Sequence, residues 1–541
     1  MKLDLRALDR EFAHLLQQHW QATSEVAEAG AQVSAALGQG DTRVAWSAVP
    51  DLKGVPAVAE VASDTDLGVR TEPARRPLVL DGDFIALHRP WTQEHRLART
   101  FRSLSLPTAE TLLPGTLGLL DQLFPPRLAE TLQRQAALLP FQSRLAVISG
   151  GPGTGKTRVL ARLLALVYEQ ALGAGLAPPR VALCAPTGKA ARRMAEALAK
   201  AVADDPETLA PYAELKALLP VTIHRLLGLG GPLNVDLVAV DEASMVDLGL
   251  MDALLSALPP RAKLVLLGDA DQLPPVEPGR VLGDLVAGLV SLQPTPVVVL
   301  THSYRFDGQQ AIGLVAQAVN SGNASATLEA LRRPVTSDSS CTLEPLFVPQ
   351  QVVEMLRRKF APFLATRTPQ TAWDALDSYL ALAVVNDGPW GQVGLNQALV
   401  EVLHPAEPRP VMITENDPRT GLSNGELGVI LPGPGGNLAW FRGFERPFPE
   451  PLLPPHQTAF VITIHKSQGS EFDSLTVVLP PDRERSRLTL SRELLYTAIT
   501  RAKRHCVLVA TEDQLRQAVA TPNQRQSGLL DKLARWKNPT P

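Results

Sequence analysis

The stretch GGPGTGKT, at residues 150–157, decides the fold of this chain. It fits the pattern G-x4-G-K-[ST], follows the apolar run LAVIS and precedes the helical pattern RVLARLLALV. Glycines at this spacing let consecutive backbone N–H groups turn inward around phosphate oxygens, and the helix that follows adds its positive end. We expect Lys156 to contact the β- and γ-phosphates and Thr157 to ligate Mg²⁺. The rest of the expected nucleotide-binding loop is Gly150, Gly151, Pro152, Gly153, Thr154 and Gly155.

Two carboxylates belong with this loop. Asp241 and Glu242 directly follow the apolar run LVAV. A carboxylate at the end of a neighbouring parallel strand can coordinate Mg²⁺, and a second one beside it can deprotonate an attacking water. An Asp-Glu pair after a strand is more often a helix cap with a solvated neighbour. Downstream of a phosphate loop, however, we interpret Asp241 as a Mg²⁺ ligand and Glu242 as the general base.

Apolar runs alternate with helical patterns through most of the chain. LAVIS, VALCA, LVAV and LVLLG each end at a polar loop, and a similar texture returns near the C-terminus in AFVITI, LTVVLP and CVLVA. Continuous apolar strands separated by helices are typical of a parallel sheet buried on both faces. Between the two regions, short strands split by Asn-Gly and Gly-Gly turns indicate a small β-barrel. The sequence therefore predicts an α/β protein with two sheets and an inserted barrel.

The N-terminal region carries no motif of its own. Residues 3–36 have the pattern of an amphipathic helix, and the later stretch LVLDGDFIALHRPWTQEHRLARTFRSL is strand-like at first and helical from about Thr92. We interpret this region as a helical accessory or subunit-docking domain. The expected boundaries are 1–115 for this N-terminal domain, 116–280 for the first α/β domain, 281–404 and 459–541 for the second, and 405–458 for the inserted barrel.

Length and composition narrow the class of protein. With 541 residues, 45% of them hydrophobic and 20% charged, the chain has room for about 3–4 domains with ordinary globular cores. It has no apolar run of the ~18 residues that a membrane helix needs, and its N-terminus lacks the pattern of a signal peptide. Cys184, Cys341 and Cys506 are far apart in the sequence, which argues against a disulfide framework or a zinc site. We expect a cytoplasmic protein.

The charge balance bears on nucleic-acid binding. A net charge of −3 argues against a grip on nucleic acid by the whole surface. Any such contact would need a local groove or partner subunits. Composition alone does not suggest a partner of this kind.

Eight motifs in a fixed order indicate the class of protein more closely. They resemble the motifs of superfamily 1 helicases, and among these the pattern is most similar to the RecD family, the alpha subunit of bacterial exodeoxyribonuclease V. The N-terminal segment LDGDFIALHRPWTQEHRLARTF and the terminal RQSGLL are similar to the same family. The motifs are GGPGTGKT, APTGKAA (185–191), TIHRLLG (222–228), DEASMVD (241–247), LGDADQLPPVEPG (267–279), SYRF (303–306), VITIHKSQGSEF (461–472) and YTAITRAK (496–503).

The resemblance implies two RecA-like domains with an SH3-like inserted barrel, and ATP bound with Mg²⁺ in the cleft between the domains. It further implies a bacterial ATP-dependent 5′→3′ translocase or helicase that acts on single-stranded DNA at duplex ends. Its partners would be the beta and gamma subunits of exodeoxyribonuclease V, in a heterotrimer for double-strand break repair and homologous recombination. The sequence has no separate nuclease-type carboxylate cluster, so cleavage would belong to a partner. Two alternatives stay open: a stand-alone superfamily 1 helicase, and a structural subunit whose ATP site only regulates assembly.

The family's motifs assign further nucleotide contacts residue by residue. Gln133 matches the position that hydrogen-bonds adenine, with a surface glutamine as the alternative. Gln272 matches the position that senses the γ-phosphate, with a loop-structuring amide as the alternative. Arg305 and Arg501 are the expected cross-domain cations, because a guanidinium can clamp the charge of a transferring phosphoryl group. Glu471 matches the position that touches the nucleotide's sugar, or else forms a structural salt bridge.

Other residues of these motifs line the single-strand groove in the family. Hydroxyls, backbone amides and cations at loop tips suit phosphate contact without base readout. His465 has an alternative interpretation as a neutral residue with satisfied hydrogen bonds. The expected DNA-binding residues are Thr187, Lys189, Thr222, His224, His465, Lys466 and Ser467.

Two features depart from the family's pattern. RecD-like helicases usually carry a small hairpin where the duplex splits, and here only residues 229–234 separate the HRLLG run from Asp236. That length is too short for a wedge, so either another element separates the strands or this subunit translocates along a strand that its partners have opened. The residue before Gln133 is Leu132, where an aromatic is common in relatives, which leaves adenine stacking open.

Overall fold

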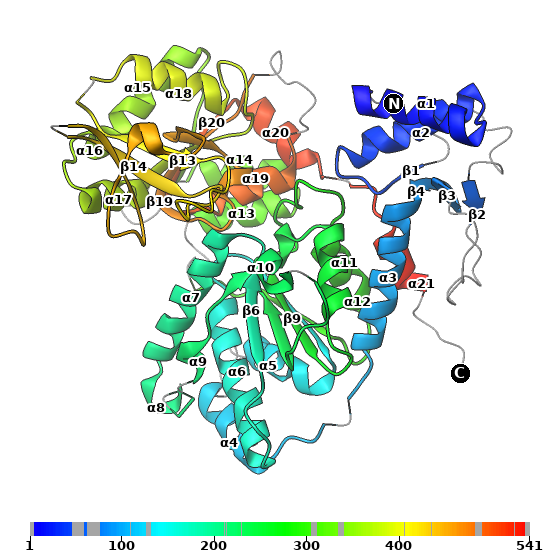
Figure 1. The fold of residues 1–541 in the computed structure, drawn as a ribbon. Coiled ribbons are helices and arrows are strands. Elements are labelled where there is room, and N and C mark those ends of the chain that lie inside the picture. Colours follow the sequence, from blue (N-terminus) through cyan, green and yellow to red (C-terminus); the bar gives the residue numbers. More distant parts are fainter. Residues whose placement is uncertain are drawn as a thin grey trace.

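The computed structural model shows two α/β bodies, one above the other in Figure 1, with an N-terminal part beside them. Helix α3 (His88–Leu104) runs along the flank of the lower body. The residues that the structure describes are 5–45, 59–61, 76–108, 110–125, 131–209, 211–212, 214–228, 230–304, 311–333, 340–404, 406–433, 435–481, 490–523 and 525–535.

The lower body is a parallel sheet between two layers of helices, as its apolar strands predict. Its strands are β5 Leu145–Gly150, β6 Val181–Ala185, β7 Val221–Thr222, β8 Leu237–Val240, β9 Lys263–Gly268 and β10 Val297–Leu300, in the order β10-β5-β9-β8-β6-β7. Its helices are α4 Pro114–Leu123, α5 Thr131–Gln142, α6 Lys156–Gly173, α7 Gly188–Ala203, α8 Pro206–Leu209, α9 Glu214–Ala217, α10 Ile223–Leu227, η4 Ala243–Met245, α11 Leu248–Ala257 and α12 Val281–Leu289. Along β5, Ala146 and Ile148 join the core shared with α5, α6 and α7, whereas Leu145 and Val147 join the core shared with α3, α11 and α12. The strands therefore have two buried faces.

The structure moves two of the expected domain boundaries. Strand β10 pairs with β5, from Val297 opposite Val147 to Leu300 opposite Gly150, so the first domain extends beyond residue 280. At the C-terminus, α21 (Leu529–Arg535) packs against α3 and α12 rather than joining the second domain. Periodicity predicts that a strand or a helix exists but not which sheet or helices it packs against, which is why both boundaries were misplaced.

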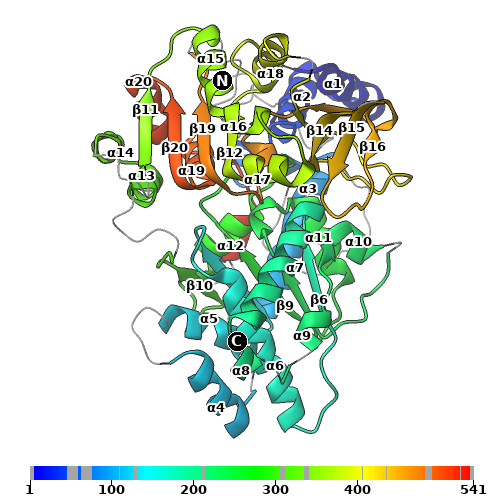
Figure 2. The same cartoon turned by 90° about the vertical axis from the view of Figure 1, so that its left-hand side faces the viewer.

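The upper body is a second parallel sheet, of order β11-β20-β19-β12-β18, and Figure 2 shows its first four strands side by side. Its strands are β11 Ser340–Glu344, β12 Tyr379–Ala383, β18 Val461–Thr463, β19 Phe472–Val478 and β20 Ala502–Val509. Its helices are α13 Ala311–Asn320, α14 Ala324–Leu331, α15 Pro349–Lys359, α16 Ala361–Leu364, α17 Pro369–Ser378, α18 Gln392–Glu401, η6 His465–Ser467, α19 Arg492–Ile499 and α20 Glu512–Ala520. Chain segments on both sides of the insert contribute to one hydrophobic core, for example Leu380 and Val477. The chain thus contains two RecA-like α/β domains.

The insert is an antiparallel sheet of order β16-β15-β14-β13-β17. Its elements are β13 Arg409–Ile413, β14 Leu427–Gly433, β15 Gly436–Phe441, β16 Phe448–Pro449, η5 Glu450–Leu452 and β17 His456–Thr458. A small apolar core that includes Val411, Ile430 and Phe441 lies on one of its faces. Among the described strands β16 and β17 are the two edges of this order and share no ladder, so the closed barrel stays a prediction.

The N-terminal part combines helices with a sheet, so the expectation of a helical domain holds only for its first half. The single helix predicted over residues 3–36 is divided in two, because Gln21 adopts a left-handed φ of +53° after α1. The sheet that follows has the order β1-β4-β3-β2. The elements are α1 Ala7–Trp20, α2 Ser24–Leu37, β1 Arg43–Ala45, β2 Ala59–Val61, β3 Leu78–Asp81 and β4 Phe84–Leu87.

Two further features of the fold are the state of the cysteines and the lengths of the helices. All three cysteines are buried free thiols. Cys341 on β11 lies opposite Cys506 on β20, so these two are neighbours in space although they are far apart in the sequence. Among the described helices, none combines the length and the apolar character that crossing a membrane requires.

Candidate nucleotide site and nucleic-acid groove

The phosphate loop connects the end of β5 to the start of α6, as the sequence predicts. Gly153 and Gly155 have φ angles of +76° and +83°, which glycine adopts without steric cost. The Lys156 ammonium donates hydrogen bonds to the carbonyls of Gly150 at 2.6 Å and Gly151 at 3.1 Å. The loop therefore folds around its own lysine, which places the charge where a phosphate can reach it.

Asp241 and Glu242 lie at the end of β8, beside the phosphate loop. Burial raises the pKa of Asp241 to about 6, the neighbouring charge of Glu242 also raises this pKa, and Lys156 opposes both effects. Glu242 has a φ of +51°, a left-handed conformation that residues other than glycine rarely adopt and that is concentrated at functional sites. Asp241, which has a carboxylate, and Thr157, which has a hydroxyl, are among the residues that line one cavity. Both are oxygen ligands of the kind that Mg²⁺ binds, and a cation there would favour the ionised carboxylate.

A cavity of about 440 Å³ lies between the two RecA-like domains. Arg501, from the second domain, is 2% exposed. Its Nε donates to the carbonyl of Thr497 and its Nη1 to that of Ser470, both at 3.3 Å, so the guanidinium is held in place. The predicted residues that line this cavity are, from the first domain, the loop from Pro152 to Thr157, Asp241, Glu242 and Gln272 and, from the second, Glu471 and Arg501.

Gln272 lies at a hydrogen-bonded link between the domains. Its side-chain amide donates to Oδ2 of Asp269 at 3.2 Å, and the same oxygen accepts a hydrogen bond from the hydroxyl of Tyr496 at 3.0 Å. Asp269 is 2% exposed, and burial raises its pKa to about 6, whereas the charge of Lys156 lowers it. Oε1 of Gln272 is buried and meets no hydrogen-bond donor among the described residues. The amide thus has spare bonding capacity beside the cavity.

Two predicted nucleotide contacts already have protein partners. Gln133 is 4% exposed and donates from Nε2 to the carbonyl of Thr154 at 3.1 Å, so it braces the phosphate loop from behind. Its contact with adenine stays a prediction. Glu471 forms an ion pair with Arg193 at 3.3 Å, which is the alternative that the sequence left open for it.

The SYRF motif reaches the phosphate loop from the end of β10. The hydroxyl of Ser303 donates to the carbonyl of Pro152 at 3.1 Å, and the backbone N–H of Tyr304 donates to that of Gly153 at 2.8 Å. The Tyr304 side chain is half exposed. Arg305, the other predicted cross-domain cation, lies outside the described residues.

The predicted DNA-binding residues divide by exposure. Thr187 and Thr222 cap α7 and α10, and each hydroxyl accepts a hydrogen bond from the backbone N–H three residues later, at 3.2 and 3.1 Å. His224 and Lys466 are exposed. Ser467 is fully buried and its hydroxyl donates to the carbonyl of residue 464 at 2.7 Å. The hydroxyls of this set therefore form hydrogen bonds within the protein, and their contact with a DNA strand stays a prediction.

Two partly buried basic residues of the same set have pKa values below their usual range. Burial lowers the pKa of Lys189 to about 8, and the charge of Arg193 lowers it as well. Burial also lowers the pKa of His465, and the charge of Arg525 adds to the effect. Both changes favour the neutral base, which for His465 agrees with the alternative interpretation.

Comparisons with known proteins identify the family. Residues 129–334 match the family model of an AAA domain, and residues 458–509 match that of a UvrD-like helicase C-terminal domain. The chain is 37% identical to the RecBCD enzyme subunit RecD of Mycobacterium tuberculosis, over 93% of each chain. The chain belongs to the RecD family. The ATP-dependent RecD2 DNA helicase of Deinococcus radiodurans is 31% identical over 72% of this chain and 50% of its own length. A solved structure of Pif1 helicases at forked double-stranded DNA aligns with a TM-score of 0.40 and 18% identity, over 72% of this chain and 94% of that one.

This RecD-family chain has a short connection where the family's hairpin is expected. The structure describes residues 228 and 230–236 of the connection between α10 and β8, and it contains no strand there. The N–H of Leu233 donates to the carbonyl of Ala257 and that of Asp236 to the carbonyl of Arg180, both at 2.8 Å. The connection is therefore held against the first domain.

Three polar side chains at the site were not predicted. Asp269 and Tyr496 lie inside motifs quoted above, LGDADQLPPVEPG and YTAITRAK, so a signal for them was present in the RecD-family pattern. Arg193 lies on α7, after APTGKAA, and lines the nucleotide cavity. It has no signal of its own, because its role depends on a partner in the other domain.

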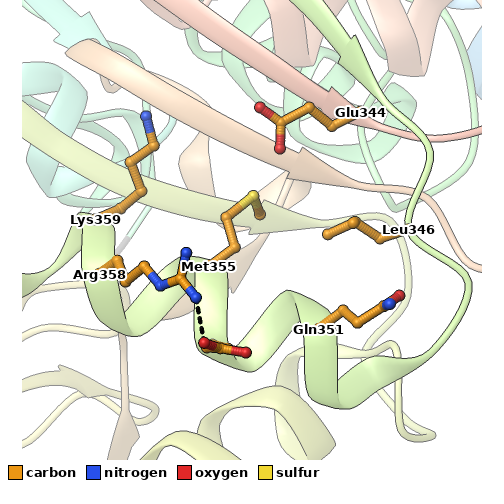
Figure 3. Close-up of a pocket in the computed structure, with 7 residues that line it drawn as sticks. Glu344, Leu346, Gln351, Met355, Arg358 and Lys359 are labelled. Carbon is orange, nitrogen blue, oxygen red and sulfur yellow. Dashed lines mark hydrogen bonds and ion pairs between the residues drawn. The ribbon is translucent and has the colours of Figure 1, made fainter.

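A separate hollow of about 400 Å³ lies on the second RecA-like domain of this RecD-family chain. Figure 3 shows Glu344 and Leu346 facing the helix α15, from which Met355 and Arg358 project. Arg358 forms an ion pair with Glu354 one turn away. None of the residues that line this hollow also lines the nucleotide cavity, so it is distinct from the ATP site.

Proposed function

We propose that this chain is an ATP-dependent 5′→3′ translocase and helicase on single-stranded DNA, and that it acts as RecD, the alpha subunit of exodeoxyribonuclease V, in double-strand break repair and homologous recombination. The cavity with walls from both RecA-like domains carries the proposal, since Lys156 and Glu242 line it from one side and Arg501 from the other. A divided site of this kind closes on its substrate and reopens after reaction, so turnover moves one domain against the other. The relative named as a RecBCD enzyme subunit, which matches along almost the whole chain, supports the biological setting.

The chemistry follows from the residues around the cavity. Glu242 accepts the proton of the water that attacks the γ-phosphorus, and the bond from that phosphorus to the bridging oxygen of ADP breaks. Lys156 and Arg501 stabilise the negative charge that spreads over the phosphoryl oxygens. Thr157 and Asp241 would hold Mg²⁺, which would supply positive charge to neutralise the β- and γ-phosphates. We assign Arg305 to the same stabilising role as Arg501.

The nucleoside end of the substrate lies beside different residues. We assign the adenine edge to Gln133 and a stacking contact to Tyr304, whose half-exposed ring lies next to the phosphate loop and offers a flat apolar face. Glu471 can reach a ribose only by exchanging its ion pair with Arg193. Gln272 would exchange its bond with Asp269 for one to the γ-phosphate, which couples the substrate to the inter-domain link.

The single strand would cross the loop tips of both domains. We infer phosphate contacts for the two helix-capping threonines and for the exposed His224 and Lys466, which lie on motifs from different domains. Lys189, His465 and Ser467 are less exposed and would contact the strand through the backbone or after the cleft closes. Because the chain's net charge is −3, the affinity would come from these few contacts and would fall as salt rises.

The remaining parts are assigned to assembly. We propose that the N-terminal α+β domain docks the beta and gamma subunits, that DNA cleavage belongs to a partner, and that the insert is an SH3-like barrel beside the groove. The short connection at 230–236 favours a subunit that moves along a strand already opened by its partners. The setting we propose is the bacterial cytoplasm.

Steady-state ATP hydrolysis by the full-length chain tests the proposal, with and without oligo(dT). We expect the DNA to raise turnover many-fold and Lys156→Gln to abolish it. Lys359→Gln, at an exposed position of α15 that lines the separate hollow and not the nucleotide cavity, is the matched control and should behave like the wild type. DNA-independent turnover would contradict a translocase and favour a structural subunit with a regulatory ATP site.

Co-purification decides between a subunit and a stand-alone helicase. A tagged full-length chain should recover the two other subunits of exodeoxyribonuclease V in a stable heterotrimer. A monomer that unwinds duplexes alone, at the rate of the assembled enzyme, would contradict the subunit assignment.

A further inference from the structure

The stretch RQSGLL, residues 525–530, has no part in the proposed nucleotide site, although the sequence resemblance singles it out. It leads into α21, and Figure 1 shows α21 beside α3, away from the neighbouring C-terminal helices α19 and α20. We call residues 525–535 the C-terminal strap. It lies between the N-terminal part and the first RecA-like domain, and it contacts both.

Arg525 binds the end of one loop of the first RecA-like domain. Its Nη1 donates to the backbone carbonyls of Glu277 at 2.7 Å and Gly279 at 3.0 Å. These carbonyls close the segment 269–279, which begins at the inter-domain link and carries Gln272; we call it the Gln272 loop. A guanidinium presents several donors in a fixed fork, so one side chain can hold adjacent carbonyls together.

The N-terminal domain meets the loop at the same place. The N–H of Gly279 donates to the carbonyl of Gly40 at 3.0 Å, and the N–H of Gln526 donates to Oδ1 of Asp41 at 2.8 Å. Gly40 has a φ of +95°, and a Cβ there would lie 2.4 Å from Cζ of Arg525. A side chain would be strained at this positive φ, so glycine suits the backbone where the N-terminal domain meets the strap and the loop.

Buried charges fix the rest of the strap. Nζ of Lys532 lies 2.8 Å from Oε2 of Glu94 on α3 and 3.4 Å from Oδ2 of Asp81 on β3, and these side chains are 3%, 2% and 7% exposed. Arg535 adds an outer ion pair with Asp81 at 3.0 Å. Removing one partner of a buried ion pair is strongly destabilising, so the strap is firmly attached to α3 and β3.

The opposite end of the Gln272 loop is held by the second RecA-like domain. The N–H of Leu273 donates to Oγ1 of Thr497 at 2.9 Å, and Tyr496 donates to Asp269 at 3.0 Å. Between the two ends lie the buried prolines 274–275, whose fixed φ angles limit bending. One short, stiff loop thus connects the second domain to the N-terminal domain and the strap.

We propose that Arg525 is a positioning residue for ATP hydrolysis. It anchors the far end of the Gln272 loop, so that movement of the second RecA-like domain displaces Gln272 relative to a fixed segment. The inference rests on the proposed function, because it takes a cleft that closes on ATP as given. Without the guanidinium, the carbonyls of residues 277 and 279 lose a shared donor. The loop end then keeps the bond from Gly279 N–H to Gly40 and the bond from Leu248 N–H to the carbonyl of Pro278 at 3.0 Å, so it yields more to movement of the second domain. DNA binding is then transmitted less fully to the ATP site.

The test compares Arg525→Ala and Arg525→Lys in the full-length chain, with Arg535→Ala as the matched control. Arg535 belongs to the same strap but contacts Asp81 rather than the Gln272 loop. Oligo(dT)-stimulated kcat should fall about fivefold or more in Arg525→Ala, with a smaller change in the KM for ATP. Arg525→Lys should recover part of the loss, and Arg535→Ala should keep full stimulation.

Hydrogen–deuterium exchange separates this inference from the proposed function. Exchange of the peptide covering 269–280 should rise in Arg525→Ala and stay unchanged in Arg535→Ala, whether or not DNA stimulates the wild type. Unchanged exchange and full stimulation in Arg525→Ala would overturn the inference. Equal losses in both variants would also overturn it, because they would show a general effect of the strap on folding. A wild type without DNA stimulation would instead contradict the proposed function.

Discussion

The substitution Tyr496→Phe removes one hydroxyl, and the structure predicts its outcome in detail. The hydroxyl donates at 3.0 Å to Asp269, across the boundary between the two RecA-like domains, and it is buried. Phenylalanine keeps the ring and its packing, so only the hydrogen bond is lost. Asp269 then keeps the amide of Gln272 at 3.2 Å and the N–H of Asp271 at 3.1 Å as donors.

The size of the effect follows from the charge of the acceptor. A hydrogen bond to an ionised group contributes about 1.5–3 kcal/mol. Because this bond joins the two domains in the arrangement that the structure shows, its loss should lower the population of that arrangement by about 10- to 100-fold relative to arrangements without the bond. The DNA-stimulated kcat/KM for ATP should fall by a similar factor.

The pH dependence of ATP hydrolysis provides a second, independent prediction for this variant. The Tyr496 hydroxyl lowers the pKa of Asp269, which burial raises to about 6, so Tyr496→Phe should move this pKa upward toward neutrality. Activity that requires ionised Asp269 is present above its folded-state pKa and is lost as the pH falls through it. The acidic limb of the rate profile should therefore shift to higher pH in the variant.

The assay is DNA-stimulated ATP hydrolysis measured from pH 5.5 to 9. Tyr379→Phe is the matched control, because its hydroxyl bonds to Thr476 at 2.8 Å within the second domain alone. A Tyr496→Phe rate profile that superimposes on the wild type, or an equal loss in Tyr379→Phe, would refute the reasoning.

Three further predictions concern the cavity and the strap. Arg501→Ala should lower kcat by about 10³-fold or more, measured in single-turnover hydrolysis, while Arg501→Lys recovers only part because one ammonium cannot replace the forked contacts. Glu242→Gln should keep binding of a fluorescent ATP analogue but lower hydrolysis by about 10²–10⁴-fold, and the loss of its charge should lower the pKa of Asp241, as a pH titration of binding would show. Lys532→Met should destabilise the chain by about 3–5 kcal/mol in urea unfolding, since it leaves the buried carboxylate of Glu94 without its ion pair, whereas Arg358→Ala, at an exposed pair, should cost at most about 1 kcal/mol.

The position of the phosphate loop and of its neighbouring carboxylates in the fold could be predicted because its determinants are local. The phosphate loop needs glycines at fixed offsets between a strand and a helix, and GGPGTGKT supplies them within eight residues. The carboxylates of Asp241 and Glu242 follow their own strand, and the geometry of a parallel sheet brings them to the loop. The two RecA-like sheets were predictable for the same reason, since their strands are continuous apolar runs.

The features that were missed depend on contacts between distant segments. Arg193 gains its place from Glu471 in the other domain, and no pattern around residue 193 announces that. In the N-terminal sheet, the strand-like stretch LVLDGDFIAL forms β3 and β4 as predicted. Strands β1 and β2 were missed because they have only three residues each, too short for a periodic signal. The neighbouring thiols of Cys341 and Cys506 result from strand order, which spacing in the sequence does not give.

Direction-resolved translocation tests the central claim, that a cavity divided between two domains drives movement along DNA. Single-turnover stopped-flow runs would use oligo(dT) of increasing length, labelled at the 5′ or the 3′ end. For the wild type, the time to reach the 3′ label should grow in proportion to length, and no such signal should appear with Arg501→Ala. Arrival times independent of length, or unchanged in Arg501→Ala, would contradict the account.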